Sequence, residues 1–454
     1  MEDYIVTKNM TEGNPLKIIL LFSVPVLIGN LFQQFYNMVD TIIVGRYLGE
    51  EALAAVGSTG CLMFLVLGFA NGIAQGFGVM ISHCYGAKDY KLLKHYVALS
   101  IILTIIVSTI LTSVTMVASR QLLHWMNTPD NIFELANNYI SVIYGGIILT
   151  MSYNVAAGIL RGIGDSKTPL LFLILSSFLN IFLDIILIVV IPLGTAGAAY
   201  ATIISQGISA ILCFAYMFRK FDILKIKRDD IYVDRMSVIK LLSIGVPMAL
   251  NYSVTAVGTI IYQGAMNVFG SSVIAAFTAG AKVFNTTTQT MPAIGTAMAT
   301  FCGQNLGAGK YDRIFKGMHY AFFLCIATAA LGAFLSLAGG EMVVGWFISD
   351  PTPEIFAYAM EYLLIISIYY LPLAWIFIYR NALQSLNEGF IPMLSGAVEL
   401  ICRVIVVAFC AKPFGFTGIC YADPAAWTVT GILLLVTYIH WKKKMQKKLG
   451  QALI

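Results

Sequence analysis

Long apolar stretches fill this chain, and the few polar side chains inside them recur at helical spacing. Three stretches hold residues three or four positions apart, which a helix places on one face: Tyr36, Asn37 and Asp40; Asn180 and Asp184; Thr202 and Gln206. Two carboxylates with amide and hydroxyl oxygens form a set of hard oxygen ligands, suited to Na⁺ or to a shared proton. If the three helices converge, Asp40, Asn180, Asp184 and Thr202 would bind a cation.

Periodicity does not show that the helices converge. The alternative is that Asp40 caps or meets water at the outer end of its helix, while Asn180 and Asp184 hold helices together. Apart from a Na⁺ at Asp40 and Asp184, the sequence predicts no metal site.

The second half of the chain has a different polar set. Glu399 and Arg403 are four residues apart in one apolar stretch, a spacing that predicts a structural salt bridge within a helix. Lys282 has no obvious partner, and we expect it to line a substrate cavity together with Tyr36, Asn37 and Gln206.

The elements that position these residues must be membrane helices. Of 454 residues only 11% are charged and 59% are hydrophobic, with a mean hydropathy of +0.82. Soluble proteins have about a quarter charged residues, so this chain cannot cover a water-facing surface. The apolar stretches suit helices of about 20 residues rather than barrel strands. This excludes soluble enzymes and nucleic-acid binders, and we expect neither catalysis nor a cofactor.

The apolar runs predict an all-α polytopic protein with twelve transmembrane helices. They are 15–45, 52–81, 92–118, 133–159, 168–191, 196–218, 238–268, 273–301, 316–340, 355–379, 391–411 and 417–440. With this assignment, 23 Lys and Arg residues fall on the side of the two termini and only Arg46, Arg120 and Lys412 on the other. The positive-inside rule therefore predicts that both termini are cytoplasmic in a multi-pass protein of the cell membrane.

The sequence also repeats itself at a spacing of 221 to 223 residues. Pro25 recurs as Pro247, Gly197 as Gly418, and Pro169 as Pro392, and these are three of several ordered pairs. The repeat predicts two lobes of six helices that enter the membrane in the same direction. We expect a cytoplasmic tail 1–13, a first lobe 14–220, a cytoplasmic linker 221–236, a second lobe 237–440 and a basic cytoplasmic tail 441–454.

Two segments carry a family resemblance. Phe32 to Gly45, which surrounds Asp40, and the loop Arg161 to Pro169 resemble the multidrug and toxic compound extrusion (MATE) family along residues 14 to 440. The resemblance implies a secondary antiporter that exports cationic or amphipathic drugs in exchange for Na⁺ or H⁺ by alternating access. It is closest to the DinF-like branch, whose cation site implies the same four residues, Asp40, Asn180, Asp184 and Thr202. The acidic residues of the NorM-like branch in helices seven and ten are missing here.

The expected partners are small organic cations or drugs and the lipid bilayer, and we expect a monomer. The main alternative is a flippase or exporter of a lipid-linked or anionic substrate in the same superfamily. A pyrophosphate headgroup would favour several unpaired Arg or Lys in the membrane region, which offers only Lys282 and Arg403. A channel or membrane scaffold is a third reading, which uphill transport would exclude.

Overall fold

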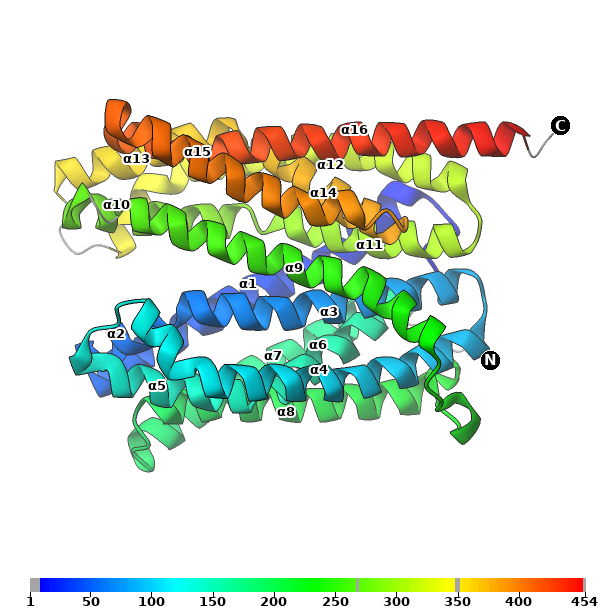
Figure 1. The fold of residues 1–454 in the computed structure, drawn as a ribbon, viewed down its shortest axis with the longest axis horizontal. Helices are drawn as coiled ribbons and strands as arrows, with labels where there is room; N and C mark the ends of the chain where they lie inside the picture. The colour runs from blue at the N-terminus through cyan, green and yellow to red at the C-terminus, as the bar shows by residue number, and fades with distance from the viewer. Residues whose placement is uncertain (1–8, 267–268, 348–351, 452–454) are drawn as a thin grey trace. The chain divides into compact units, whose positions relative to one another are not determined.

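The computed structural model is helical over the residues it describes, which are 9–266, 269–347 and 352–451 (Figure 1). No β-strand occurs in these ranges. The helices of the first half are α1 (Pro15–Leu48), α2 (Glu50–Ser58), α3 (Gly60–Gly86), α4 (Tyr90–Trp125), α5 (Asp130–Gly145), α6 (Ile147–Gly162), α7 (Lys167–Asp184) and α8 (Thr195–Lys220). Those of the second half are α9 (Arg235–Met266), α10 (Ser271–Thr287), α11 (Thr290–Gly307), α12 (Tyr311–Phe347), α13 (Pro353–Ile368), α14 (Tyr370–Ser385), α15 (Phe390–Cys420) and α16 (Ala422–Gln451).

Most predicted spans have a counterpart among these helices. Within the described ranges, nine helices are long and apolar enough to cross a membrane, and two bent pairs raise the number to eleven. The pairs are α5 with α6, bent by 48°, and α13 with α14, bent by 52°. The twelfth predicted span, 273–301, is divided between α10 and α11, and α10 with 17 residues is too short to cross alone.

The backbone confirms the internal repeat. Left-handed backbone is unusual, yet it recurs at corresponding positions of the two halves, 221 or 223 residues apart. The pairs, with their φ angles, are Gly49 (87°) and Gly270 (93°); Lys88 (57°) and Gly309 (68°); Gly164 (93°) and Asn387 (61°); Gly194 (62°) and Gly415 (57°). The bends after α5 and α13 also correspond, since Gly146 and Tyr369 are 223 positions apart. Equivalent turns thus join equivalent helices in both halves.

Two predicted boundaries are wrong. The predicted loop between 411 and 417 is part of α15, which continues to Cys420 through a kink at Gly415. A single residue in left-handed conformation bends the helix there instead of opening a loop. Arg380 was placed in a cytoplasmic loop, but α14 continues to Ser385 and contains it.

The described chain packs as two units. The first contains residues 28–253, and the second contains Thr11–Leu27 and the residues from Val254 onward. Because α1 and α9 each contribute to both units, this division follows contacts rather than the predicted lobes 14–220 and 237–440, which stay a prediction. The first eight residues of the predicted tail 1–13 and the last three of 441–454 lie outside the described residues.

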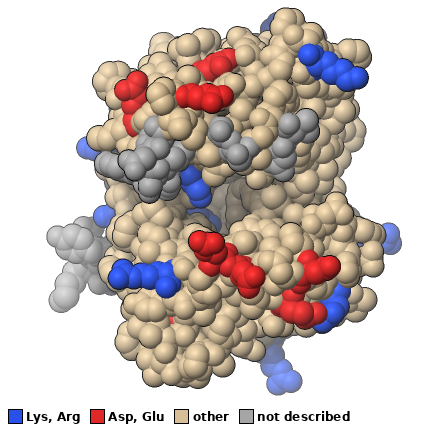
Figure 2. Space-filling view, turned by 90° about the vertical axis from the view of Figure 1, so that its left-hand side faces the viewer, with Lys and Arg blue, Asp and Glu red and all other residues tan. Residues whose placement is uncertain are grey.

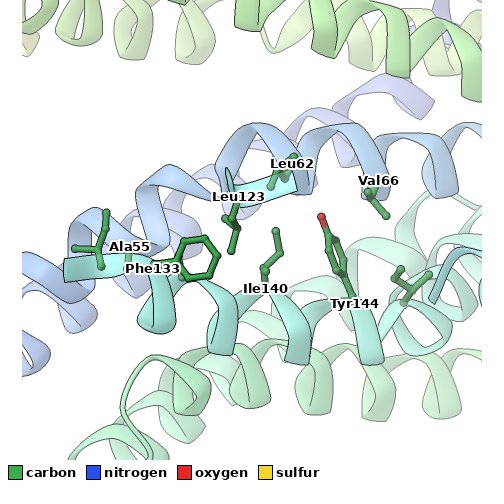
Figure 3. Packing of buried hydrophobic residues seen from close by; sticks show 10 residues of the cluster. Ala55, Leu62, Val66, Leu123, Phe133, Ile140 and Tyr144 are labelled. Atoms are coloured by element: carbon green, nitrogen blue, oxygen red, sulfur yellow. The ribbon is translucent and has the colours of Figure 1, made fainter. Parts of the chain in front are cut away.

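Buried apolar clusters in the first unit hold its helices in place. In one cluster Phe133, Ile140 and Tyr144 of α5 pack against Leu62 of α3 and Leu123 of α4 (Figure 3). A second cluster joins α1, α2, α5 and α8 to the short π-helix Ile185–Val190 (η1) that continues α7; its buried members are Ile43, Val44, Ala52, Tyr139, Ile143, Ile188, Ala198 and Ala199. This second cluster fixes the helices that carry Asp40, Asp184 and Thr202.

The surface is mostly uncharged. Figure 2, which looks at the molecule from the left-hand side of Figure 1, shows few Lys, Arg, Asp and Glu side chains among other residues. Along the helices many large apolar side chains are exposed, among them Val117 (89%), Phe409 (74%) and Ile211 (68%). Such a surface suits contact with lipid.

The predicted linker is anchored to α4 within the first unit. The ring nitrogens of buried His95 lie 3.0 Å from Asp234 Oδ1 and 3.1 Å from the carbonyl oxygen of Asp230, and Tyr232 stacks on the ring. The backbone N–H of Ser237 donates to Asp234 Oδ2 at 2.8 Å. This hydrogen bond, supported by the contact with His95, lowers the pKa of Asp234 from its ordinary value.

Candidate functional site

The predicted cation-binding residues come from three helices of the first unit. Asp40 lies inside α1, Asn180 and Asp184 in the last turns of α7, and Thr202 in α8. The chain changes from α-helix to the π-helix η1 directly after Asp184. Short π-helical segments inside helices frequently occur at functional sites, since they alter which side chains face inward.

The structure brings the four residues together. The Asn180 side-chain amide donates to Thr202 Oγ1 at 3.4 Å, which joins α7 to α8. The carboxyl groups of Asp40 and Asp184 are close enough to interact, which joins α1 to α7. Asp184 is fully buried and Asn180 is 2% exposed. The convergence that periodicity left open is therefore present, and cation binding itself stays a prediction.

The oxygens of this group lack protein donors. Asp40 Oδ1, Asn180 Oδ1 and both carboxyl oxygens of Asp184 are buried without a hydrogen-bond partner among the described residues. Ionised carboxylates are costly in such surroundings unless a cation or proton accompanies them. The alternative role of Asp40 as a cap at the helix end does not fit, because α1 continues to Leu48.

Aromatic and amide side chains surround the two carboxyl groups. The Tyr36 hydroxyl lies next to Asp40, Gln33 and Gln206, while Asn37 is exposed. Tyr139 of α5 is buried and interacts with Asp40, Tyr36 and Asp184. Sequence reasoning missed Tyr139 because it gave no attention to a single tyrosine in an apolar stretch. Only its place on a face shared with buried Ile143 could have drawn attention to it.

In the second unit Glu399 and Arg403 belong to a longer chain of charges. Arg403 Nη2 lies 3.6 Å from Glu399 Oε2, the predicted pair within α15. Glu399 also pairs with Arg380 of α14, and Arg403 Nε donates to Asp423 Oδ1 of α16 at 2.7 Å. The four side chains are at most 13% exposed. Sequence reasoning missed Arg380, which it assigned to a loop, and Asp423, whose partner lies twenty residues away.

Lys282 differs from the other predicted cavity residues. It lies in α10 of the second unit, its side chain is exposed, and no acidic side chain in the described part of the chain pairs with it. Its expected contact with Glu399 is absent from these ion pairs, so a role in a cavity stays a prediction.

Comparison with known proteins places this architecture. The family model described as MatE matches twice, at residues 25–186 and 247–409, in agreement with the repeat. Two Bacillus subtilis (strain 168) proteins are similar along most of their length. YpnP, "Probable multidrug resistance protein", is 29% identical over 80% of each chain, and YoeA, of the same description, is 27% identical over 99% of each.

A crystal structure of a MATE protein in complex with MaL6 has the same fold. It superposes with a TM-score of 0.89 at 23% identity and covers 97% of this chain and 99% of that one. Together with the two matched segments of the family model, this shows that the chain belongs to the MatE family.

Proposed function

We propose that the protein is a secondary active antiporter that exports cationic or amphipathic drugs across the cell membrane in exchange for Na⁺ or H⁺. The observation that carries the proposal is the convergence of Asp40 and Asp184, with buried oxygens that no described donor satisfies. Membership of the MatE family and the names of the two Bacillus subtilis relatives support export of drugs as the transported class.

In this mechanism the coupling ion reduces the repulsion between the two carboxyl groups. Na⁺ would take oxygens of Asp40, Asp184, Asn180 and Thr202, whereas a proton would be shared between the two carboxyls. Binding of a cationic substrate near Tyr36 and Gln206 would disfavour the bound ion, because both positive charges compete for the same carboxylates. Loading and release of the ion then alternate with those of the substrate as the lobes change conformation.

The alternative is an exporter of lipid-linked or anionic substrates. Recognition of a phosphate-rich headgroup favours arginines that are free to form bidentate contacts. Arg380 and Arg403 each carry a carboxylate partner. The arrangement therefore favours a cationic or amphipathic substrate.

The test is transport by purified protein in proteoliposomes, with Na⁺ and pH gradients imposed separately and a fluorescent organic cation as substrate. Asp40→Asn and Asp184→Asn should each fold and lose uphill accumulation. Asp229→Asn, in the exposed linker, is the matched control and should transport normally. Asp165→Asn is a weaker control than its loop position suggests, because Asp165 is buried and accepts three hydrogen bonds from Lys167 and Thr168.

If both membrane variants still concentrate the substrate at wild-type rates, the coupling site is elsewhere. If the wild type moves lipid-linked or anionic cargo and not the organic cation, the alternative function is the right one.

A further inference from the structure

The internal repeat allows the candidate cation site to be compared with its counterpart in the second half. Each helix has its own anchor pair outside the site. Pro25 and Pro247 set a spacing of 222 for α1 and α9, and Pro169 and Pro392 set 223 for α7 and α15. Gly194 and Gly415, both left-handed, set 221 for the start of α8 and its counterpart.

These spacings identify the equivalent of each site residue, from positions chosen without regard to charge. The equivalents are Tyr262 for Asp40, Arg403 for Asn180, Val407 for Asp184 and Asp423 for Thr202; Tyr362 corresponds to Tyr139 at the spacing of 223 that joins the bends at Gly146 and Tyr369. The second half has thus lost both carboxylates at the positions of Asp40 and Asp184, and has gained a guanidinium and a carboxylate.

The equivalent residues also come together in the second unit. Arg403 donates to Asp423 at 2.7 Å, where the first unit has the hydrogen bond from Asn180 to Thr202. Buried Tyr262 interacts with Tyr362, Asp423 and Arg403, just as the hydroxyl of Tyr139 lies beside the carboxylates of the first unit. The second unit has therefore kept the position of the cluster while its chemistry has changed.

The change in chemistry exchanges acceptors for donors. In the first unit the buried atoms without a partner are oxygens of Asp40, Asn180 and Asp184. In the second they are Arg403 Nη1 and the Tyr262 hydroxyl. Carboxylates from two helices hold the Arg403 guanidinium, Asp423 at 2.7 Å and Glu399 at 3.6 Å.

A glycine makes room for the guanidinium. Tyr36 of the first unit corresponds to Gly258, 222 positions later, and a Cβ added at Gly258 would lie 2.7 Å from Arg403 Nη1. A side chain of any size at this position would therefore displace Nη1. The second half lacks the aromatic side chain in the place where the guanidinium must fit.

We propose that Arg403 is a built-in cation that fills the second half's copy of the cation site, so that only the first half binds an exchangeable Na⁺ or proton. This inference rests on the proposed function of Asp40 and Asp184. It implies that removal of Arg403 exposes a latent site, because Asp423 then keeps a buried negative charge without its guanidinium. A Na⁺ or a proton would bind there in place of the guanidinium.

The test counts cations bound to purified full-length protein, with ²²Na⁺ for sodium and a pH-sensitive dye for protons. In the wild type, Asp423→Asn should leave cation binding unchanged, whereas Asp40→Asn with Asp184→Asn should abolish it. In that silent background, Arg403→Asn should restore about one cation per protein. Arg403→Lys, which keeps a fixed positive charge, should restore none, and Arg403→Asn with Asp423→Asn should also restore none.

Two results would overturn the inference. One is a folded, monodisperse Arg403→Asn variant in the silent background that binds no cation. The other is a loss of wild-type cation binding on Asp423→Asn, a measurement that does not require any Arg403 variant to fold. The proposed function fails separately, if Asp40→Asn with Asp184→Asn keeps full cation binding that is insensitive to Asp423→Asn.

Discussion

Replacing Glu399 by glutamine should destabilise the second unit through Arg380 rather than through Arg403. Glu399 is the only carboxylate that contacts Arg380 in the described structure, where Ser395 Oγ is the other partner of that guanidinium. Arg403 keeps Asp423 at 2.7 Å when Glu399 is neutral. Breaking a buried ion pair by removing one partner costs about 3–5 kcal/mol, so Glu399→Gln should lower the free energy of unfolding by about that amount.

A double-mutant cycle separates the two partners of Glu399. Arg380→Met and Arg403→Met are each measured alone and combined with Glu399→Gln, with unfolding followed by denaturant titration in detergent. The coupling energy of Glu399 with Arg380 should exceed that with Arg403, whose nearest contact with Glu399 is 3.6 Å, and about 0.5–3 kcal/mol is typical of residues in one network. Arg380→Met with Glu399→Gln should recover much of the stability that Glu399→Gln loses.

The reasoning fails if the cycle gives no coupling between Glu399 and Arg380, or a larger coupling with Arg403. It also fails in its structural sense if Glu399→Gln unfolds like the wild type but no longer transports. In that case the charges serve transport and not folding.

Three further predictions concern packing, pH and topology. A Cβ at Gly76 of α3 would lie 2.4 Å from the Gly245 Cα of α9, so Gly76→Ala should lower the melting temperature through overpacking of about 1–3 kcal/mol, while Gly60→Ala, with nothing within 4 Å, should be neutral or slightly stabilising in a thermal shift assay. Because the folded pKa of Asp234 is lowered, its contribution to linker stability is present above the ordinary pKa of an aspartate and is lost as the pH falls through the folded pKa; hydrogen exchange in 221–236 should rise with acid in the wild type and already be raised at neutral pH in Asp234→Asn. A tag placed after Ile454 should be inaccessible from outside intact cells, and labelling there would overturn the predicted orientation.

The sequence predicts the broad architecture well because two signals extend over the whole chain. Apolar length locates the helices, and the ordered pairs at 221 to 223 residues locate the repeat, which the matched left-handed residues Gly194 and Gly415 confirm. Helix breaks are less predictable. The kink at Gly415 and the division between α10 and α11 depend on single-residue backbone angles within apolar sequence, where composition gives no boundary.

Partners across helices are the part that periodicity cannot supply. Spacing correctly places Glu399 and Arg403 on one face of α15, but it is silent on which other helix that face meets. Arg380 and Asp423 come from α14 and α16, so their contacts depend on tertiary packing. The same limit applies to Tyr139, which joins the candidate cation site from a fourth helix.

The repeat itself supplies what periodicity lacks. Once Thr202 is known to accept from Asn180, the spacings of 221 and 223 point to Asp423 as the partner of Arg403 before any distance is measured. A duplicated backbone keeps its pairs of facing positions even when the side chains change. A charge that replaces a neutral residue at one such position therefore needs its counter-ion at the other, and Arg403 with Asp423 meets that requirement at 2.7 Å.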